Sequence, residues 1–136
     1  MADAVLGGST ALRKALGAAE TLGKEAHHII PMELLKKESV VQDAVNAGFD
    51  FNGKVNGIGL KKYTKAGEAA GDLGVHANHP KYTQQVLNEI NEWATAAKAS
   101  KTYSPQNAKK FLENLSGNIK KLIKENPNTK VNNLKF

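Results

Sequence analysis

Two long amphipathic patterns occupy the second half of the chain. Between residues 80 and 97 apolar side chains recur at the spacing of one helix face, and Pro80 suits the first position of a helix. A second helix is predicted to begin at Ser104-Pro105 and to end before Pro127, with residues 128–136 as a polar tail. The apolar positions of the two patterns are Tyr82, Val86, Ile90 and Trp93, then Phe111, Leu112, Leu115, Ile119, Leu122 and Ile123.

Shorter helices are predicted in the first half of the chain. Ser9 or Thr10 can cap a helix that Gly23 would end. Residues 33–47 have close to helical spacing, with Gly48 as the stop. The turn-rich link that follows contains two aromatic side chains that we expect in the core, Phe49 and Phe51.

Two short strands are predicted around these helices. Residues 25–30 end in β-branched side chains and are closed by Pro31, which cannot donate to a ladder. Asn56-Gly57 is a turn signal, and residues 58–61 can follow it as a second strand, although two glycines, Gly57 and Gly59, weaken the prediction. Together the strands would form a β-loop-β unit. Residues 63–74 are small and polar, which is typical of a loop.

These elements predict a mostly helical α+β fold. A short hairpin and the helix over residues 80–97 would form its centre, with additional N-terminal and C-terminal helices. The length of 136 residues fits one domain. We expect its motif-bearing core over about residues 12–97 and a helical extension over residues 98–136.

Composition excludes several classes of protein. No apolar run is long enough to predict a membrane span, and the first residues lack the pattern of a secretory signal. The chain has no cysteine, which excludes disulfides and thiolate zinc sites. Any metal site must therefore use His, Asp, Glu or Asn.

The net charge of +6 is unevenly distributed. Residues 1–97 contain 10 basic and 11 acidic side chains, whereas residues 98–136 contain 9 lysines and 2 glutamates. A basic segment of this kind indicates a polyanion-binding surface or, equally, a solvated lysine-rich face. The candidate nucleic-acid contacts are Lys109, Lys110, Lys120, Lys121 and Lys124.

The four histidines form two clusters, His27-His28 and His76 with His79. Neighbouring residues of a strand point to opposite faces, so one ring of the first pair can hold a metal while the other faces substrate. Imidazole changes charge near neutral pH, so the second ring can act as a general base. Pro80 disfavours helical geometry at His79, which we expect to cap the helix, where free amides also favour a phosphate.

Three ordered motifs carry a resemblance to a known family. They are Glu25-Ala26-His27-His28-Ile29-Ile30-Pro31, then Asn56-Gly57-Ile58-x-Leu60, then His76…His79-Pro80-x-Tyr82-x-x-x-Val86. Together they resemble the AHH branch of the HNH, or ββα-metal, nuclease superfamily over about residues 12–97. The resemblance implies that two short strands and a helix cradle one divalent metal.

The same resemblance implies a role for each residue of the motifs. His27 and His79 would be metal ligands, and His28 would be the general base that activates water. Asn56 would hold the loop between the strands and orient His28 or, as an alternative, bind the metal. His76 would be a further ligand or a phosphate contact. Two residues separate it from His79 where relatives have three, and residues after 98 lie outside the resemblance.

The function implied is that of a metal-dependent endonuclease toxin that hydrolyses DNA. The metal would be Zn²⁺, Mg²⁺, Ni²⁺ or Mn²⁺. Such modules belong to bacterial polymorphic toxins delivered into a target bacterial cell, and we expect a monomer neutralised by a cognate, acidic immunity protein. Two alternatives stay open: an RNA-cleaving toxin on the same scaffold, and a non-catalytic, zinc-bound module that binds nucleic acid. Tyr82 and Trp93 lie on the apolar stripe, so we expect them in the core.

Overall fold

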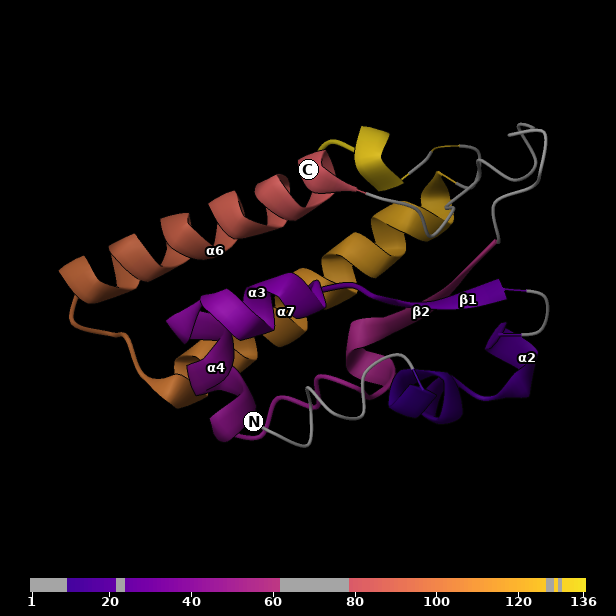
Figure 1. Ribbon diagram of the computed structural model, residues 1–136. Helices are drawn as coiled ribbons and strands as arrows, with labels where there is room; N and C mark the ends of the chain where they lie inside the picture. Colours follow the sequence, from indigo (N-terminus) through magenta and orange to yellow (C-terminus); the bar gives the residue numbers. More distant parts are fainter. Residues whose placement is uncertain (1–9, 22–23, 62–78, 127–128, 130) are drawn as a thin grey trace.

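The computed structural model describes residues 10–21, 24–61, 79–126, 129 and 131–136, and it shows the expected α+β fold with helices in the majority. Figure 1 shows a small hairpin surrounded by helices. Within the described residues, no helix is long and apolar enough to cross a membrane. After a helical stretch at residues 10–16, the elements are α2 (Ala18–Thr21), β1 (Lys24–His28), α3 (Met32–Lys37), α4 (Ser39–Asn46), η1 (Lys54–Asn56), β2 (Gly57–Lys61), α6 (Pro80–Ala99), α7 (Pro105–Glu125) and η2 (Val131–Asn133).

The two predicted strands pair with each other. β1 and β2 are antiparallel, with His27 opposite Ile58 and His28 opposite Gly57. The ladder ends at His28, two residues before the predicted end of the strand at Ile30. The cause is that the backbone N–H and C=O of Ile30 bond to the side chain of Asn56 instead of to a neighbouring strand.

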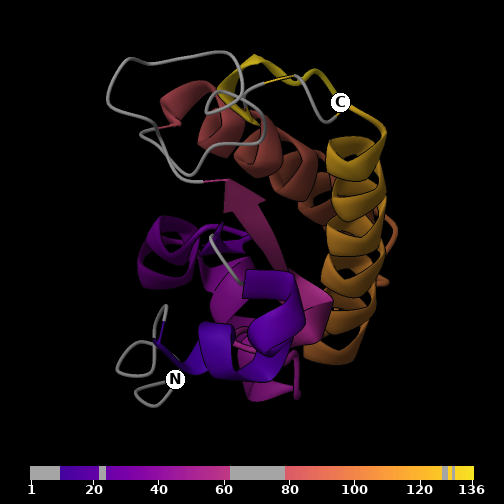
Figure 2. The same ribbon diagram turned by 90° about the vertical axis from the view of Figure 1, so that its right-hand side faces the viewer.

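The glycines that weakened the prediction of β2 allow close packing against it. A Cβ on Gly59 would lie 2.1 Å from the carbonyl oxygen of Glu20, and one on Gly57 would lie 2.5 Å from Cδ1 of Leu12. At Gly59 the atom in the way is backbone, so a side chain there would force the strand and the helix apart, whereas at Gly57 the side chain of Leu12 would have to move. The N-terminal helices therefore lie directly against the hairpin, as Figure 2 shows.

Two predicted helices are each interrupted. The helix expected to end at Gly23 breaks earlier, at Gly17, whose φ of +84° suits glycine; Gly23 itself lies outside the described residues. The helix expected over residues 33–47 is two helices, because Glu38 adopts an extended conformation with φ −107° and ψ 120°. This break lets side chains on both sides of it reach the core, namely Leu34, Leu35, Val40, Val41 and Ala44.

The long helices begin where the sequence predicts. Pro80 occupies the first turn of α6 after His79 as N-cap, and the hydroxyl of Ser104 accepts a 3.0 Å hydrogen bond from the amide of Asn107 at the start of α7. α7 runs along one side of the molecule and contacts α4 and η1 (Figure 2). Phe49 and Phe51, in the aromatic link, are buried as expected and belong to the same core as the buried residues of both helices.

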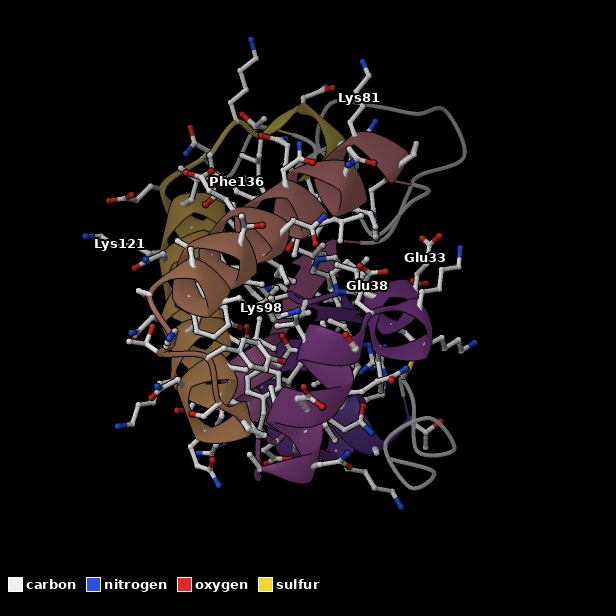
Figure 3. The ribbon with its side chains drawn as sticks, turned by 90° about the vertical axis from the view of Figure 1, so that its left-hand side faces the viewer. Glu33, Glu38, Lys81, Lys98, Lys121 and Phe136 are labelled. Atoms are coloured by element: carbon white, nitrogen blue, oxygen red, sulfur yellow. The ribbon has the colours of Figure 1, made fainter. Side chains whose placement is uncertain are left out.

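The C-terminal residues are not a solvated polar tail. Val131 and Leu134 are 2% and 4% exposed, and the ring of Phe136 contacts that of Tyr82 with centroids 5.7 Å apart. In Figure 1 this segment, drawn in yellow, lies beside the N-terminal end of α6, and Figure 3 labels Phe136 near the same helix. The prediction of a polar tail was wrong because only a few apolar side chains make this contact, and the polar residues around them hide it in the sequence.

Candidate active site

His27 and His79 meet at the junction of β1 and α6. Their ring centroids are 5.2 Å apart in an edge-on arrangement, and Tyr82 contacts both rings, with centroids 5.5 Å from His27 and 5.3 Å from His79. His27 is 1% exposed, whereas His79 is partly exposed. Nδ1 of His79 lies 3.3 Å from the hydroxyl of Thr83, one turn into the helix. Two imidazoles from distant parts of the sequence are thus brought together.

His28 contacts a different part of the chain. Its Nε2 lies 2.7 Å from Oδ1 of Asn52, and its ring stacks on Phe51 with centroids 4.9 Å apart and planes inclined by 23°. His27 contacts α6, and His28 contacts the link between α4 and η1. The separation agrees with the alternation of side chains along a strand.

Asn56 binds backbone and holds the segment that follows the two histidines. Its Oδ1 accepts from the amide of Ile30 at 2.7 Å. Its Nδ2 donates to the carbonyl oxygens of Ile30 and Phe51, at 3.2 and 3.0 Å. The side chain is fully buried. These contacts fit the loop-holding role implied for Asn56, whereas the side chain within hydrogen-bond distance of His28 is that of Asn52.

A buried hydroxyl joins α6 to the end of β1. The phenol of Tyr82 donates a hydrogen bond to the carbonyl oxygen of Ile29. Burial raises the pKa of Tyr82 far above its usual value, so the hydroxyl stays protonated and keeps its role as a donor. Tyr82 is fully buried, as expected for a core residue. Trp93 is only partly buried and stacks on Phe111, with centroids 4.9 Å apart.

The first-turn amides of α6 are not available to a phosphate. Oδ1 of Asn132 accepts from the amides of Lys81 and Tyr82 at 2.7 and 3.2 Å. The amides that were expected to be free for a phosphate at this helix end are therefore engaged by a side chain from the C-terminal segment. His79 does cap the helix by position, but its side chain makes no capping hydrogen bond.

The described part of the site offers two imidazoles to a metal. Nowhere among the described residues do three or more His, Cys, Asp or Glu side chains converge to hold an ion. His76, the further ligand implied by the resemblance, lies outside the described residues.

The candidate lysines share one side of α7. At 100° per residue, Lys109, Lys110, Lys120, Lys121 and Lys124 fall within an arc of about 120°, away from the buried face. Lys109 pairs with Glu113 at 3.1 Å. Lys120 donates to the carbonyl oxygen of Lys54 at 2.8 Å, and burial, followed by the charge of Lys124, lowers its pKa. The other three are exposed; Figure 3 shows Lys121 directed away from the helix.

Two residues of the site were missed by sequence reasoning. Asn52 was assigned to a turn, and Asn132 to a polar tail. In each, a side-chain oxygen accepts hydrogen bonds from a residue far away in the sequence. Contacts of this kind follow no spacing pattern, so the sequence gives no sign of them.

Comparison with known families identifies the chain. A nuclease family of the HNH/ENDO VII superfamily, with conserved AHH, matches residues 12–124. The comparisons with curated proteins and with solved structures gave no match. The match continues beyond residue 97, where the resemblance was expected to end, and includes nearly all of α7. Membership implies phosphodiester hydrolysis, and the superfamily typically uses a divalent metal. The chain therefore belongs to the AHH nuclease family of the HNH/ENDO VII superfamily.

Proposed function

We propose that the chain is a metal-dependent endonuclease that hydrolyses the phosphodiester bonds of DNA. One observation carries the proposal. His27 and His79 meet with ring centroids 5.2 Å apart, while the adjacent His28 is turned to another element and held there at 2.7 Å by Asn52. The arrangement separates two tasks, cation binding and proton transfer, between neighbouring residues.

His27 and His79 are the residues proposed to hold the metal. Imidazole is a common ligand of Zn²⁺ and Ni²⁺, whereas Mn²⁺ and Mg²⁺ would need additional oxygen ligands. Bound there, the ion would neutralise charge on the phosphate and on the leaving oxygen. The contact of His79 with Thr83 orients the ring and would assign metal binding to Nε2.

His28 is proposed as the general base. It would take a proton from the attacking water as the oxygen bonds to phosphorus and the bond from phosphorus to the 3′ oxygen breaks. The leaving oxygen would take its proton from solvent. Asn56 and Tyr82 would support this step indirectly, because they fix the backbone of Ile30 and Ile29 just after the histidine pair.

The charge of the second half of the chain supports a nucleic-acid substrate. Residues 98–136 carry 9 lysines and 2 glutamates, and the lysines of α7 lie on one side of the helix. Contacts between lysine and phosphate are largely independent of sequence and weaken with salt. We propose DNA as the substrate and RNA as the alternative that a direct comparison would separate.

We also propose that the domain is a toxin delivered into a target bacterial cell. The support is the resemblance of its motifs to nuclease modules of polymorphic toxins. An acidic immunity protein would complement the lysine side of α7 and neutralise the enzyme in the producing cell. A pull-down with the product of the neighbouring gene tests this, and a failure to bind would contradict it.

The test of the activity is plasmid nicking with Mg²⁺, Ni²⁺, Zn²⁺ or Mn²⁺, run beside an RNA substrate. We expect cleavage of DNA, loss of cleavage with EDTA, and at least a hundredfold loss in His28→Ala. Asn114→Ala, an exposed position of α7, is the control. Full activity in His28→Ala would exclude His28 as the base.

Circular dichroism in EDTA separates the nuclease from a zinc-bound structural module. The nuclease should remain folded without metal, because the hydrophobic core extends over all its long helices. A structural zinc module would unfold, since its folding free energy comes from the metal.

A further inference from the structure

The turn before η1 places an amide oxygen against the proposed general base. Oδ1 of Asn52 lies 2.7 Å from Nε2 of His28. We propose that Asn52 is a positioning residue that holds His28 in the tautomer with its proton on Nε2 and its basic lone pair on Nδ1. The catalytic consequence rests on the proposed function, whereas the tautomer itself does not.

The chemistry of the contact sets the position of the proton. An amide oxygen can only accept a hydrogen bond, so the ring nitrogen that faces it must donate. A neutral imidazole that donates from Nε2 has its lone pair on Nδ1. The basic nitrogen of His28 is thereby directed away from Asn52, and the other tautomer would set two lone pairs against each other.

Phe51 fixes the plane of the same ring. The imidazole of His28 and the phenyl ring are stacked, with centroids 4.9 Å apart. Stacking restrains tilting of the imidazole, and the hydrogen bond restrains its rotation within the plane. Because His28 is 8% exposed, few other orientations are available to it. Two consecutive residues, Phe51 and Asn52, thus determine where Nδ1 points.

The turn that carries Asn52 is itself rigid. The amide of Gly53 donates to the carbonyl oxygen of Asp50 at 3.0 Å, and the amide of Asn56 donates to that of Gly53 at 3.1 Å. A Cβ on Gly53 would lie 2.0 Å from Oδ2 of Asp50, so the carboxylate covers the turn closely. Asn56 also binds the carbonyl oxygen of Phe51 at 3.0 Å. Asn52 is therefore held by the same buried asparagine that secures the end of β1.

The first test is the tautomer of His28, read from ¹⁵N chemical shifts in labelled protein under conditions in which its ring is neutral. We expect the wild type to carry the proton on Nε2 and Asn52→Leu to show a mixture of tautomers. Asn52→Asp retains an acceptor and should restore the wild-type pattern. A wild-type proton on Nδ1 would overturn the assignment, whether or not the protein cleaves DNA.

The second test is the kinetics of DNA cleavage. Asn52→Leu should lower kcat by about 10- to 100-fold, the order expected for a misoriented catalytic group, with KM unchanged. Asn52→Asp should stay within a few fold of wild type. Asn114→Leu, the same change at an exposed position of α7, is the control and should leave kcat and the tautomer unchanged. An equal loss in Asn114→Leu, or an unchanged kcat in Asn52→Leu, would overturn the positioning role.

These readouts separate the two proposals. If the wild type shows no cleavage of DNA or RNA with any metal, the proposed function fails while the tautomer still decides the role of Asn52. If the wild type cleaves DNA but the proton is on Nδ1, the nuclease stands and Asn52 does not orient its base. Circular dichroism of each variant identifies any loss of fold. If Asn52→Leu does not fold, the tautomer and kcat of Asn52→Asp, which retains an acceptor, still test the positioning role of Asn52.

Discussion

Replacement of Asn132 by alanine should destabilise the protein by removing the cap of α6. The helix lacks a cap of its own, because Pro80 has no N–H and the side chain of His79 makes no capping hydrogen bond. Oδ1 of Asn132 instead accepts from the amides of Lys81 and Tyr82 at 2.7 and 3.2 Å. Loss of a capping side chain typically costs about 0.5–2 kcal/mol. We place this one at roughly 1–2 kcal/mol, since two amides lose their partner.

Urea denaturation followed by the fluorescence of Trp93 measures this cost, since that is the only tryptophan and it stacks on Phe111. Asn133→Ala is the matched control, because the neighbouring side chain is exposed and should change the free energy of unfolding by less than about 0.5 kcal/mol. Asn132→Asp should be at least as stable as wild type, because a carboxylate also accepts and favours a helix N-terminus. Equal stability of the two alanine variants would refute the capping role.

Three further substitutions follow from the packing and the charges. Gly59→Ala should lower the free energy of unfolding by about 1–3 kcal/mol, because its Cβ would meet the carbonyl oxygen of Glu20. Gly117→Ala should instead raise the free energy of unfolding by about 0.5–1 kcal/mol, since nothing lies within 4 Å of a Cβ there. Urea denaturation midpoints compare the two variants. Burial and the hydrogen bond to Asp43 raise the pKa of Tyr103 to about 12, so the folded state keeps a proton that the unfolded state loses near pH 10. Stability should therefore fall as the pH rises from 10 to 12, less steeply in Tyr103→Phe; parallel curves for the two proteins would contradict this.

The helices with strong periodicity and clear start signals were predicted well from the sequence. Pro80 and the Ser104-Pro105 pair mark the first turns of α6 and α7 in the structure. Both signals are local, since a proline fixes its own backbone and a serine bonds to an amide three residues on. Local chemistry of this kind is visible in a sequence before any tertiary contact is known.

The interruptions at Gly17 and Glu38 depend instead on tertiary contacts. Residues 33–47 have acceptable helical spacing, and no proline or glycine marks a break at Glu38. The extended conformation there turns Leu35 and Val41 into the same core. Burial of apolar side chains outweighs the continuity of a short helix, which has little stability of its own. Such a break cannot be predicted without the surface on which the helices pack.

The candidate site divides in the same way. The family motifs pointed to His27 and His79, and the structure brings their rings together. The partners that would set the direction of each ring lie elsewhere: Asn52 for His28 and Asn132 for the helix that begins after His79. A hydrogen bond between two side chains far apart in sequence has no periodicity, so a single sequence gives no signal for it.

Asn132 lies beyond the family match, which ends at residue 124, and yet it caps the helix that presents His79. His79 immediately precedes the first turn of α6, so the position of its ring follows that turn directly. Two hydrogen bonds fix the first turn. The hydroxyl of Tyr82 donates to the carbonyl oxygen of Ile29, and Oδ1 of Asn132 accepts from the amide of Lys81. The contact between the rings of His27 and His79 thus depends on Tyr82 and Ile29, which lie inside the family match, and on Asn132, which lies outside it. In this chain the C-terminal segment belongs to the support of the site, although the motifs that define the family do not include it.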